Sequence, residues 1–192
     1  MTWVIIGSVV LLVLIFYGWY VALISRRNKA REALASIDVH LQKRFDLLPN
    51  VLKLAQKFMA HEKSMMERLT QLRTEVARDY SKTDPAAVQG HIAAAKELEA
   101  GMTRLFAVAE NYPELRSSDT IVEAQKTFLE VEAQVAAARR FYNAAVNSLN
   151  NSVEIFPGSL IAGMARVQAL PFYEVETQEA RKAINVDDYL KS

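Results

Sequence analysis

Residues 121–149 read IVEAQKTFLEVEAQVAAARRFYNAAVNSL, and the spacing of the apolar residues in this stretch decides the fold. Steps of three and four residues alternate along it without exception, which is typical of a long helix that packs against other helices. The apolar stripe consists of Ile121, Ala124, Phe128, Val131, Val135, Ala138, Tyr142, Ala145 and Leu149. Phe156-Pro157-Gly158-Ser159 is expected to end the helix.

Two further helices are predicted before this one. Apolar residues recur at mostly three- and four-residue steps over residues 34–76, and Pro49 inside this run predicts a kink rather than an end. Asp84-Pro85 is typical of a helix start, and the second helix is expected to end before Tyr112-Pro113. Because short loops join the three helices, the sequence predicts an all-α fold, a long antiparallel three-helix, coiled-coil-like bundle.

The residues after position 156 differ in character from the bundle. Leu160 to Met164 is expected to form a short helical turn, residues 171–175 are expected to be extended, and residues 177–184 are expected to form a short helix. This C-terminal tail is predicted to pack along the bundle.

An uncharged segment near the N-terminus predicts a membrane anchor. Residues 3–24 carry no charged side chain, and fourteen of them are Val, Ile, Leu or Phe. As a helix this segment spans about 33 Å, enough to cross a hydrocarbon core of about 30 Å. Only Met1 and Thr2 precede it and no small-x-small site follows, which argues against a cleaved signal peptide. We expect a transmembrane anchor over residues 1–25, continuing into a helical domain over residues 26–192.

Four basic residues follow the anchor: Arg26, Arg27, Lys29 and Arg31. By the positive-inside rule they place the N-terminus outside and the domain in the cytoplasm. They are also suited to contact anionic lipid headgroups, although a topology signal alone explains them equally well. The net charge of +1 and the position beside the membrane argue against nucleic acid as a partner.

The sequence gives no indication of catalysis. There is no cysteine, and His61-Glu62 is followed by Met65 where a zinc-protease motif needs histidine. No serine-hydrolase elbow or phosphate-binding glycine loop is present. We therefore expect no enzyme activity, no metal, no cofactor and no small-molecule substrate. The three histidines are interpreted as partly exposed helix residues, and Arg139-Arg140 as a solvated pair.

Asparagines are concentrated near the end of the third helix, at positions 143, 147, 150 and 151. Asn143 and Asn147, with Asn150 or Asn151, are spaced to share one helix face. They are predicted to hydrogen-bond across the bundle and fix helix register; a polar ligand groove is the alternative.

Residues 36–50, SIDVHLQKRFDLLPN, closely resemble the signature of the LemA family. Further matches are Tyr112-Pro113-Glu114-Leu115, Ala138-Arg139, Tyr142-Asn143, the stretch from Asn151 through Phe156-Pro157, and Phe172-Tyr173. The resemblance covers nearly the whole chain. It implies a bacterial helical-bundle protein anchored in the inner (cytoplasmic) membrane and without enzymatic activity. Some relatives are associated with membrane remodelling, and others with a membrane metalloprotease of the HtpX type.

The positions carried over from the signature are structural ones. They are Asp38, Arg44, Asp46, Pro49, Asn50, Tyr142, Asn143 and Pro157. We expect them to set register or to form an interface between copies of the chain. The resulting hypothesis is a membrane-anchored scaffold that forms a homo-oligomer and contacts membrane proteins, an integral membrane protease among them. The alternative is a membrane-shaping protein that binds anionic lipid through its basic flank.

Overall fold

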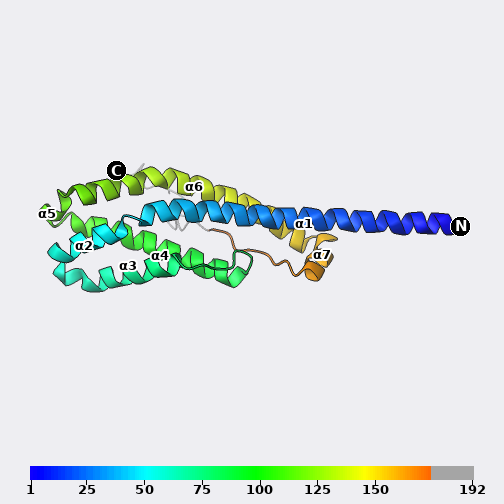
Figure 1. Ribbon diagram of the computed structural model, residues 1–192, viewed down its shortest axis with the longest axis horizontal. Coiled ribbons are helices and arrows are strands. Elements are labelled where there is room, and N and C mark those ends of the chain that lie inside the picture. The colour runs from blue at the N-terminus through cyan, green and yellow to red at the C-terminus, as the bar shows by residue number, and fades with distance from the viewer. Residues whose placement is uncertain (174–192) are drawn as a thin grey trace, which may run out of the picture.

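The computed structural model describes residues 1–173, apart from the side chain of Ala60. Within these residues all regular structure is helical, so the predicted all-α class is confirmed. The first helix, α1, runs without interruption over Thr2–Phe45, about 66 Å, and its N-terminal end projects beyond the other helices (Figure 1). The expected continuity from the anchor into the bundle is therefore confirmed. The absence of Gly and Pro between residues 19 and 48 accounts for it.

The run over residues 34–76, predicted as one kinked helix, is divided instead. Helix α1 ends at Phe45, and α2 spans Leu48–Phe58, with Pro49 in its first turn. This placement suits proline, because the first-turn amides of a helix have no partner within the helix. A single 3₁₀ turn, η1, at Ala60–Glu62 follows, and the chain turns back into α3, Lys63–Val76 (Figure 1).

Helix α4 spans Pro85–Ala109 and begins as predicted, since the Asp84 carboxylate accepts a 3.1 Å hydrogen bond from the Ala86 amide. A four-residue helix, α5, at Pro113–Arg116 leads into α6, Asp119–Glu154. The stripe on α6 is buried as expected except that Phe128 is half-buried and Val146 replaces Ala145 as the fully buried position.

The end of the described chain returns toward the anchor and then reverses. Helix α7, Gly158–Ala165, follows the end of α6, and Arg166 ends it in the left-handed conformation with φ of 52°. Residues 167–173 then run back along the bundle without regular structure, as Figure 1 shows in orange. The expected tail packing is confirmed for these residues, whereas the helix predicted at 177–184 lies outside the described residues.

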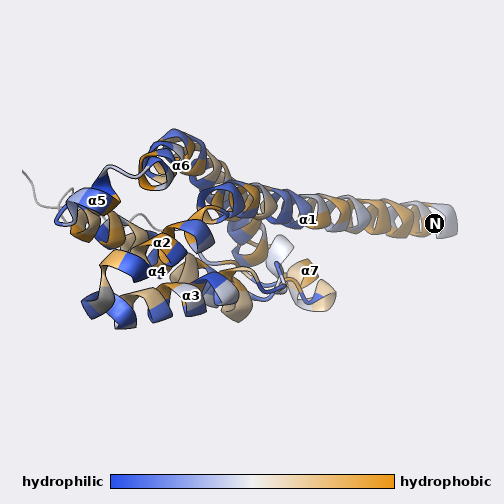
Figure 2. Ribbon diagram, turned by 60° about the vertical axis from the view of Figure 1, so that its left-hand side comes forward, coloured by the Kyte–Doolittle hydropathy of each residue, from blue (hydrophilic) through white to orange (hydrophobic). Residues whose placement is uncertain are grey.

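The helices pack as two antiparallel pairs that share one core. The most extensive packing joins α1 to α6, and the next joins α3 to α4. Each bundle helix has a polar side and an apolar side, whereas the N-terminal part of α1 is apolar all round (Figure 2). Its mean hydropathy reaches 2.4 over eighteen residues, and none of that window is buried. By length and composition, this is the single described helix able to cross a membrane.

Candidate functional site

A network of four charged side chains joins three helices in the middle of the bundle. Arg44 on α1 donates to Glu99 on α4 at 2.8 Å and also to Glu132 on α6. Arg139 on α6 donates to the second oxygen of Glu99 at 2.5 Å. Glu99 is therefore bound by two arginines from different helices, and we call these four residues the arginine–glutamate network. Two positive and two negative charges compensate one another within it.

Arg44 is the most buried member, with 1% of its side chain exposed. Its guanidinium lies 3.5 Å from the centre of the Phe128 ring, so an aromatic face covers the cation. Burial alone would lower the pKa of Arg139, but the nearby Tyr173 and Glu99 outweigh it and raise that pKa. Removing one partner from such a network leaves a buried charge uncompensated, so the network fixes how α1, α4 and α6 align.

A second cluster surrounds Asp38, one of the predicted residues. Its carboxylate accepts hydrogen bonds from Tyr80 at 3.1 Å and from Lys82, and it lies 3.0 Å from Nε2 of His91. The Tyr80 and His91 rings are stacked with centroids 4.0 Å apart. Because Tyr80 and Lys82 belong to the loop between α3 and α4, this Asp38 cluster fastens that loop to α1.

Burial would raise the pKa of Asp38, but hydrogen bonds and charge from His91 and Lys82 overcome it and lower that pKa. Burial, together with the negative charge of Asp38, raises the pKa of the Tyr80 hydroxyl. The carboxylate is thus held ionised and the phenol protonated, which suits a permanent contact between helix and loop.

Two asparagines of α6 hold the tail. The side chain of Asn150 donates to the Leu170 carbonyl and accepts from the Leu170 amide, each at 2.9 Å. Asn143 forms the same pair with Tyr173, at 3.0 and 2.7 Å. Between them the Tyr142 hydroxyl donates to the Pro171 carbonyl at 2.8 Å. Asn143 and Asn150 are seven residues apart and share a face, whereas Asn147, which was predicted on the same face, is exposed, as is Asn151. The predicted bonds across the bundle are wrong, since these two side chains bind the tail instead.

The remaining predicted positions lie at the surface or near the anchor. Asp46, Pro49 and Asn50 are exposed at the junction of α1 and α2, and Pro157 is half-buried before α7. Arg26 donates to the Ser152 hydroxyl at the end of α6. Arg27 is half-buried, and Lys29 and Arg31 are exposed. The structure thus brings Asp38, Arg44, Tyr142 and Asn143 into contacts within one chain.

Two sequence interpretations are wrong at single residues. Arg139 is buried and belongs to the arginine–glutamate network, while Arg140 is exposed as expected. His91 is buried against Asp38, and of the three histidines only His40 and His61 retain substantial exposure. Sequence reasoning also missed Glu99 and Glu132. The burial of Arg139 could have been predicted, because this residue lies four positions after Val135, on the buried side of α6.

Among residues 1–173 no three His, Asp or Glu side chains are grouped so that they could hold a metal ion. Within the described chain both charged clusters pair opposite charges across different elements. Their arrangement holds α1, α4, α6 and the loop between α3 and α4 in register, and it leaves the outer surface and the anchor region as the candidate contact sites.

Comparison with known proteins identifies relatives of the chain. Two magnetosome proteins of Paramagnetospirillum magneticum, MamQ 2 and MamQ 1, are each 26% identical to the chain over 161 residues. The aligned region covers 73% of this chain and 59% of each relative, so the chain spans about three-fifths of the length of these relatives. The family model described as the LemA family matches residues 33–187, and the chain therefore belongs to the LemA family.

Proposed function

We propose that the protein is a non-enzymatic, membrane-anchored scaffold that self-assembles and presents its helical bundle to membrane proteins. Membership of the LemA family and the single apolar helix of α1 fit a membrane-associated protein. Self-assembly and partner binding are additional proposals, and one feature of the outer surface supports self-assembly.

The feature is an apolar ridge on the outer face of α6, made of Leu129, Ala133, Ala137 and Phe141. Leu129 is 71% exposed and Phe141 is 74% exposed, which is unusual for two large apolar side chains on one helix. Four-residue spacing places the members in one row, the kind of ridge that packs into the groove of another helix. The two small alanine side chains between Leu129 and Phe141 allow the backbone of a second helix to approach closely. This α6 ridge is the observation that carries the proposal.

A second copy of the chain is the occupant we propose for the α6 ridge. Anchors in one membrane hold copies in the same orientation and at high local concentration, so a modest patch suffices for lateral association. A symmetric dimer uses the same patch on both partners, and an apolar ridge without net charge suits such self-pairing.

The native mass of the full-length protein in mild detergent tests the proposal. We expect a defined homo-oligomer, and we expect the double variant Leu129→Asp, Phe141→Asp to fall to the monomer mass. Val39→Asp is the matched control, because Val39 is 56% exposed on α1, away from the ridge, and should leave the mass unchanged. A monomeric wild type, or a double variant of wild-type mass, would refute self-assembly through α6.

The exposed junction of α1 and α2 is a second proposed contact between copies. Asp46, Pro49 and Asn50 are exposed there, and Asp46 is held by a 2.6 Å hydrogen bond from Gln42. Asp46→Lys is a clean test, because it changes surface charge without touching the buried Arg44. If this variant keeps wild-type mass and partner binding, the junction serves packing within one chain only.

We further propose that the domain lies in the cytoplasm, at the bacterial inner membrane, with the N-terminus outside. The basic flank after the anchor supports this orientation. Protease added to spheroplasts should leave the C-terminal domain intact, and digestion of the domain would reverse the orientation. The proposed partner class is an integral membrane metalloprotease of the HtpX type, and stoichiometric co-purification with such a protein from membranes would support it.

A membrane-shaping or lipid-binding role is the alternative, and the exposure of Lys29 and Arg31 beside the anchor favours it. Each basic residue at an anionic surface contributes about 1 kcal/mol to binding. The pure protein should then deform anionic liposomes and lose this effect when the four basic residues become glutamine. Lys53→Gln with Lys57→Gln is the control, since these exposed lysines lie on α2, far from the anchor.

A further inference from the structure

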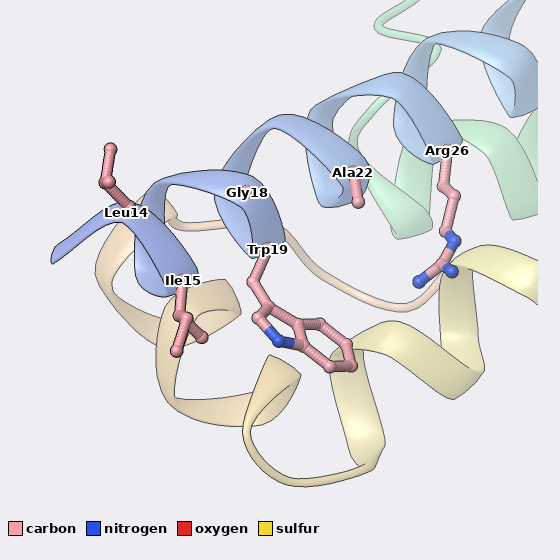
Figure 3. A pocket seen from close by; sticks show the side chains of 6 residues that line it. All are labelled: Leu14, Ile15, Gly18, Trp19, Ala22 and Arg26. Atoms are coloured by element: carbon pink, nitrogen blue, oxygen red, sulfur yellow. The ribbon is translucent and has the colours of Figure 1, made fainter. Parts of the chain in front are cut away.

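Helix α7 lies beside the apolar anchor rather than beyond its end. An open crevice separates the two helices, lined from α1 by Val13, Phe16, Tyr17 and Tyr20 and from α7 by Ile161, Met164 and Ala165. On an adjoining face of α1, the side chains of Ile15, Trp19 and Arg26 project from the same side of the helix and line a second open pocket (Figure 3). The C-terminal half of the anchor is therefore flanked by a second apolar element of the same chain.

The depth of α7 follows from the geometry of α1. Arg26 contacts Ser152, which fixes the end of α6 at the level of the first basic residue after the anchor. Tyr20 and Val13 lie six and thirteen residues before Arg26. At 1.5 Å per residue these positions are about 9 and 20 Å farther along the helix axis. One leaflet contributes about 15 Å of hydrocarbon, so α7 lies at the depth of one leaflet if Arg26 marks the membrane surface.

A position of α7 in water conflicts with an anchor that spans the membrane. The membrane boundary would then have to lie before Val13, and only residues 3–12 of the apolar segment would remain inside. Ten helical residues cover about 15 Å, half of the hydrocarbon core. The apolar segment crosses the membrane only if its part up to Ile24 lies in the hydrocarbon core. Because α7 lies beside this part of α1, α7 then lies in the membrane as well.

The composition of the segment agrees with burial in lipid. Residues 155–165 contain no charged side chain and lie between Glu154 and Arg166. Three of their large apolar side chains face away from the described protein: Phe156 is 76% exposed, Leu160 is 52% exposed and Met164 is 80% exposed. Leu160 and Met164 are four residues apart on α7 and so share a face.

The backbone of the segment also suits an apolar environment. The Val167 amide donates to the Ala162 carbonyl at 3.0 Å, and the Ser159 amide donates to the Ile155 carbonyl at 3.0 Å. These bonds satisfy polar groups at both ends of α7 without water. Arg166 follows α7 directly and is exposed, which places a long cationic side chain where it can reach the headgroups.

We propose that residues 155–165 form a second membrane contact of the protein. Helix α7 enters the leaflet that surrounds Val13–Tyr20, packs against the anchor, and has its outer face of Phe156, Leu160 and Met164 covered by lipid acyl chains. The chain then returns to the bundle through Arg166. This contact requires a spanning anchor and is independent of self-assembly through α6.

Site-specific fluorescence in lipid vesicles tests the proposal, and the cysteine-free sequence allows it directly. Full-length Leu160→Cys and Met164→Cys variants are labelled with a small fluorophore and reconstituted into vesicles of phosphatidylcholine and phosphatidylglycerol. Val9→Cys in the anchor is the lipid-exposed reference, and Val39→Cys on α1, which is 56% exposed and outside the α6 ridge, is the water-exposed reference. Each label is quenched by aqueous iodide and, separately, by lipids with a nitroxide on the acyl chain.

We expect quenching by the nitroxide lipids at positions 160 and 164, as at position 9. Iodide quenching there should be about fivefold weaker than at position 39, because the hydrocarbon region excludes hydrated anions. Labels at 160 and 164 that respond to iodide like position 39, and not to the lipid nitroxide, would overturn the proposal. A monomeric protein leaves this result unchanged, so failure of the scaffold proposal and failure of this one are distinguishable.

Discussion

Arg44 of α1 donates a 2.8 Å hydrogen bond to Glu99 of α4, fifty-five positions along the chain, and only 1% of the arginine side chain is exposed. Glu99 also accepts from Arg139 of α6. One carboxylate therefore compensates two largely buried guanidinium groups and joins the three helices. The network makes Glu99 the residue whose charge the bundle depends on most.

Replacing Glu99 by glutamine should therefore destabilise the bundle. The variant keeps the shape but removes the negative charge between two buried arginines, and loss of one partner of a buried pair costs about 3–5 kcal/mol. Since the Glu99 side chain is 20% exposed, we expect a loss of about 2–3 kcal/mol in the free energy of unfolding. Urea unfolding followed by circular dichroism in a fixed detergent measures it.

Glu97→Gln is the matched control for this experiment. Glu97 lies two residues earlier on α4 and pairs with Arg68, but both side chains are about half exposed. Solvent screens such a pair, so no measurable change in stability is expected. Equal effects of the two variants would show that the contribution of the arginine–glutamate network to the free energy of unfolding does not depend on its burial.

The Asp38 cluster predicts a dependence of stability on pH. The pKa of Asp38 is lowered in the folded protein, so its ionised form contributes stability above the unfolded-state pKa near 3.8. This contribution is lost as the pH falls through the lower, folded-state pKa. We expect Asp38→Asn to be less stable than wild type at neutral pH and to lose less stability on acidification. Unfolding curves from neutral to acidic pH measure both.

Asp46→Asn serves as the control for Asp38→Asn. Its side chain is exposed eight residues later on the chain and is bonded to Gln42 rather than to the Asp38 cluster, so the variant should match the stability of wild type at neutral pH. A pH profile of Asp38→Asn parallel to that of wild type would contradict the assigned role of the carboxylate.

The asparagine contacts predict how the tail is held. Asn150→Leu removes both side-chain bonds to the Leu170 backbone, and Asn143→Leu removes both bonds to Tyr173. We expect each change to speed hydrogen exchange of the Leu170 and Tyr173 amides while the α6 amides keep their protection. Asn147→Leu on the exposed face should leave the tail unchanged. Equal exchange in all three variants would mean that apolar packing alone holds the tail.

Much of the fold follows from local patterns in the sequence, and the remainder depends on contacts that such patterns do not encode. The stripe on α6 and the Asp84-Pro85 start of α4 were predicted because helix periodicity and capping act over a few residues. The reversal after Met59 was missed, since the apolar steps continue through it without glycine or proline. Arg139 was missed because its partner Glu99 lies forty residues away, and sequence spacing does not reveal that pairing.

The turn between α6 and α7 depends on glycine at position 158, which gives the last prediction. A Cβ atom at this position would lie 2.2 Å from the Ser152 carbonyl oxygen, and a backbone atom cannot rotate away as a side chain can. We expect Gly158→Ala to displace α7 from the end of α6, to lower stability by about 1–3 kcal/mol, and to expose the α7 amides to hydrogen exchange. Gly163→Ala is the control within the same helix, because nothing lies within 4 Å of the Cβ atom that this substitution adds. That variant should be neutral or slightly stabilising, since alanine favours a helix over glycine by up to about 1 kcal/mol. Similar behaviour of the two alanine variants would mean that the close approach to Ser152 does not hold α7 in place, and the position of α7 beside the anchor would then need another cause.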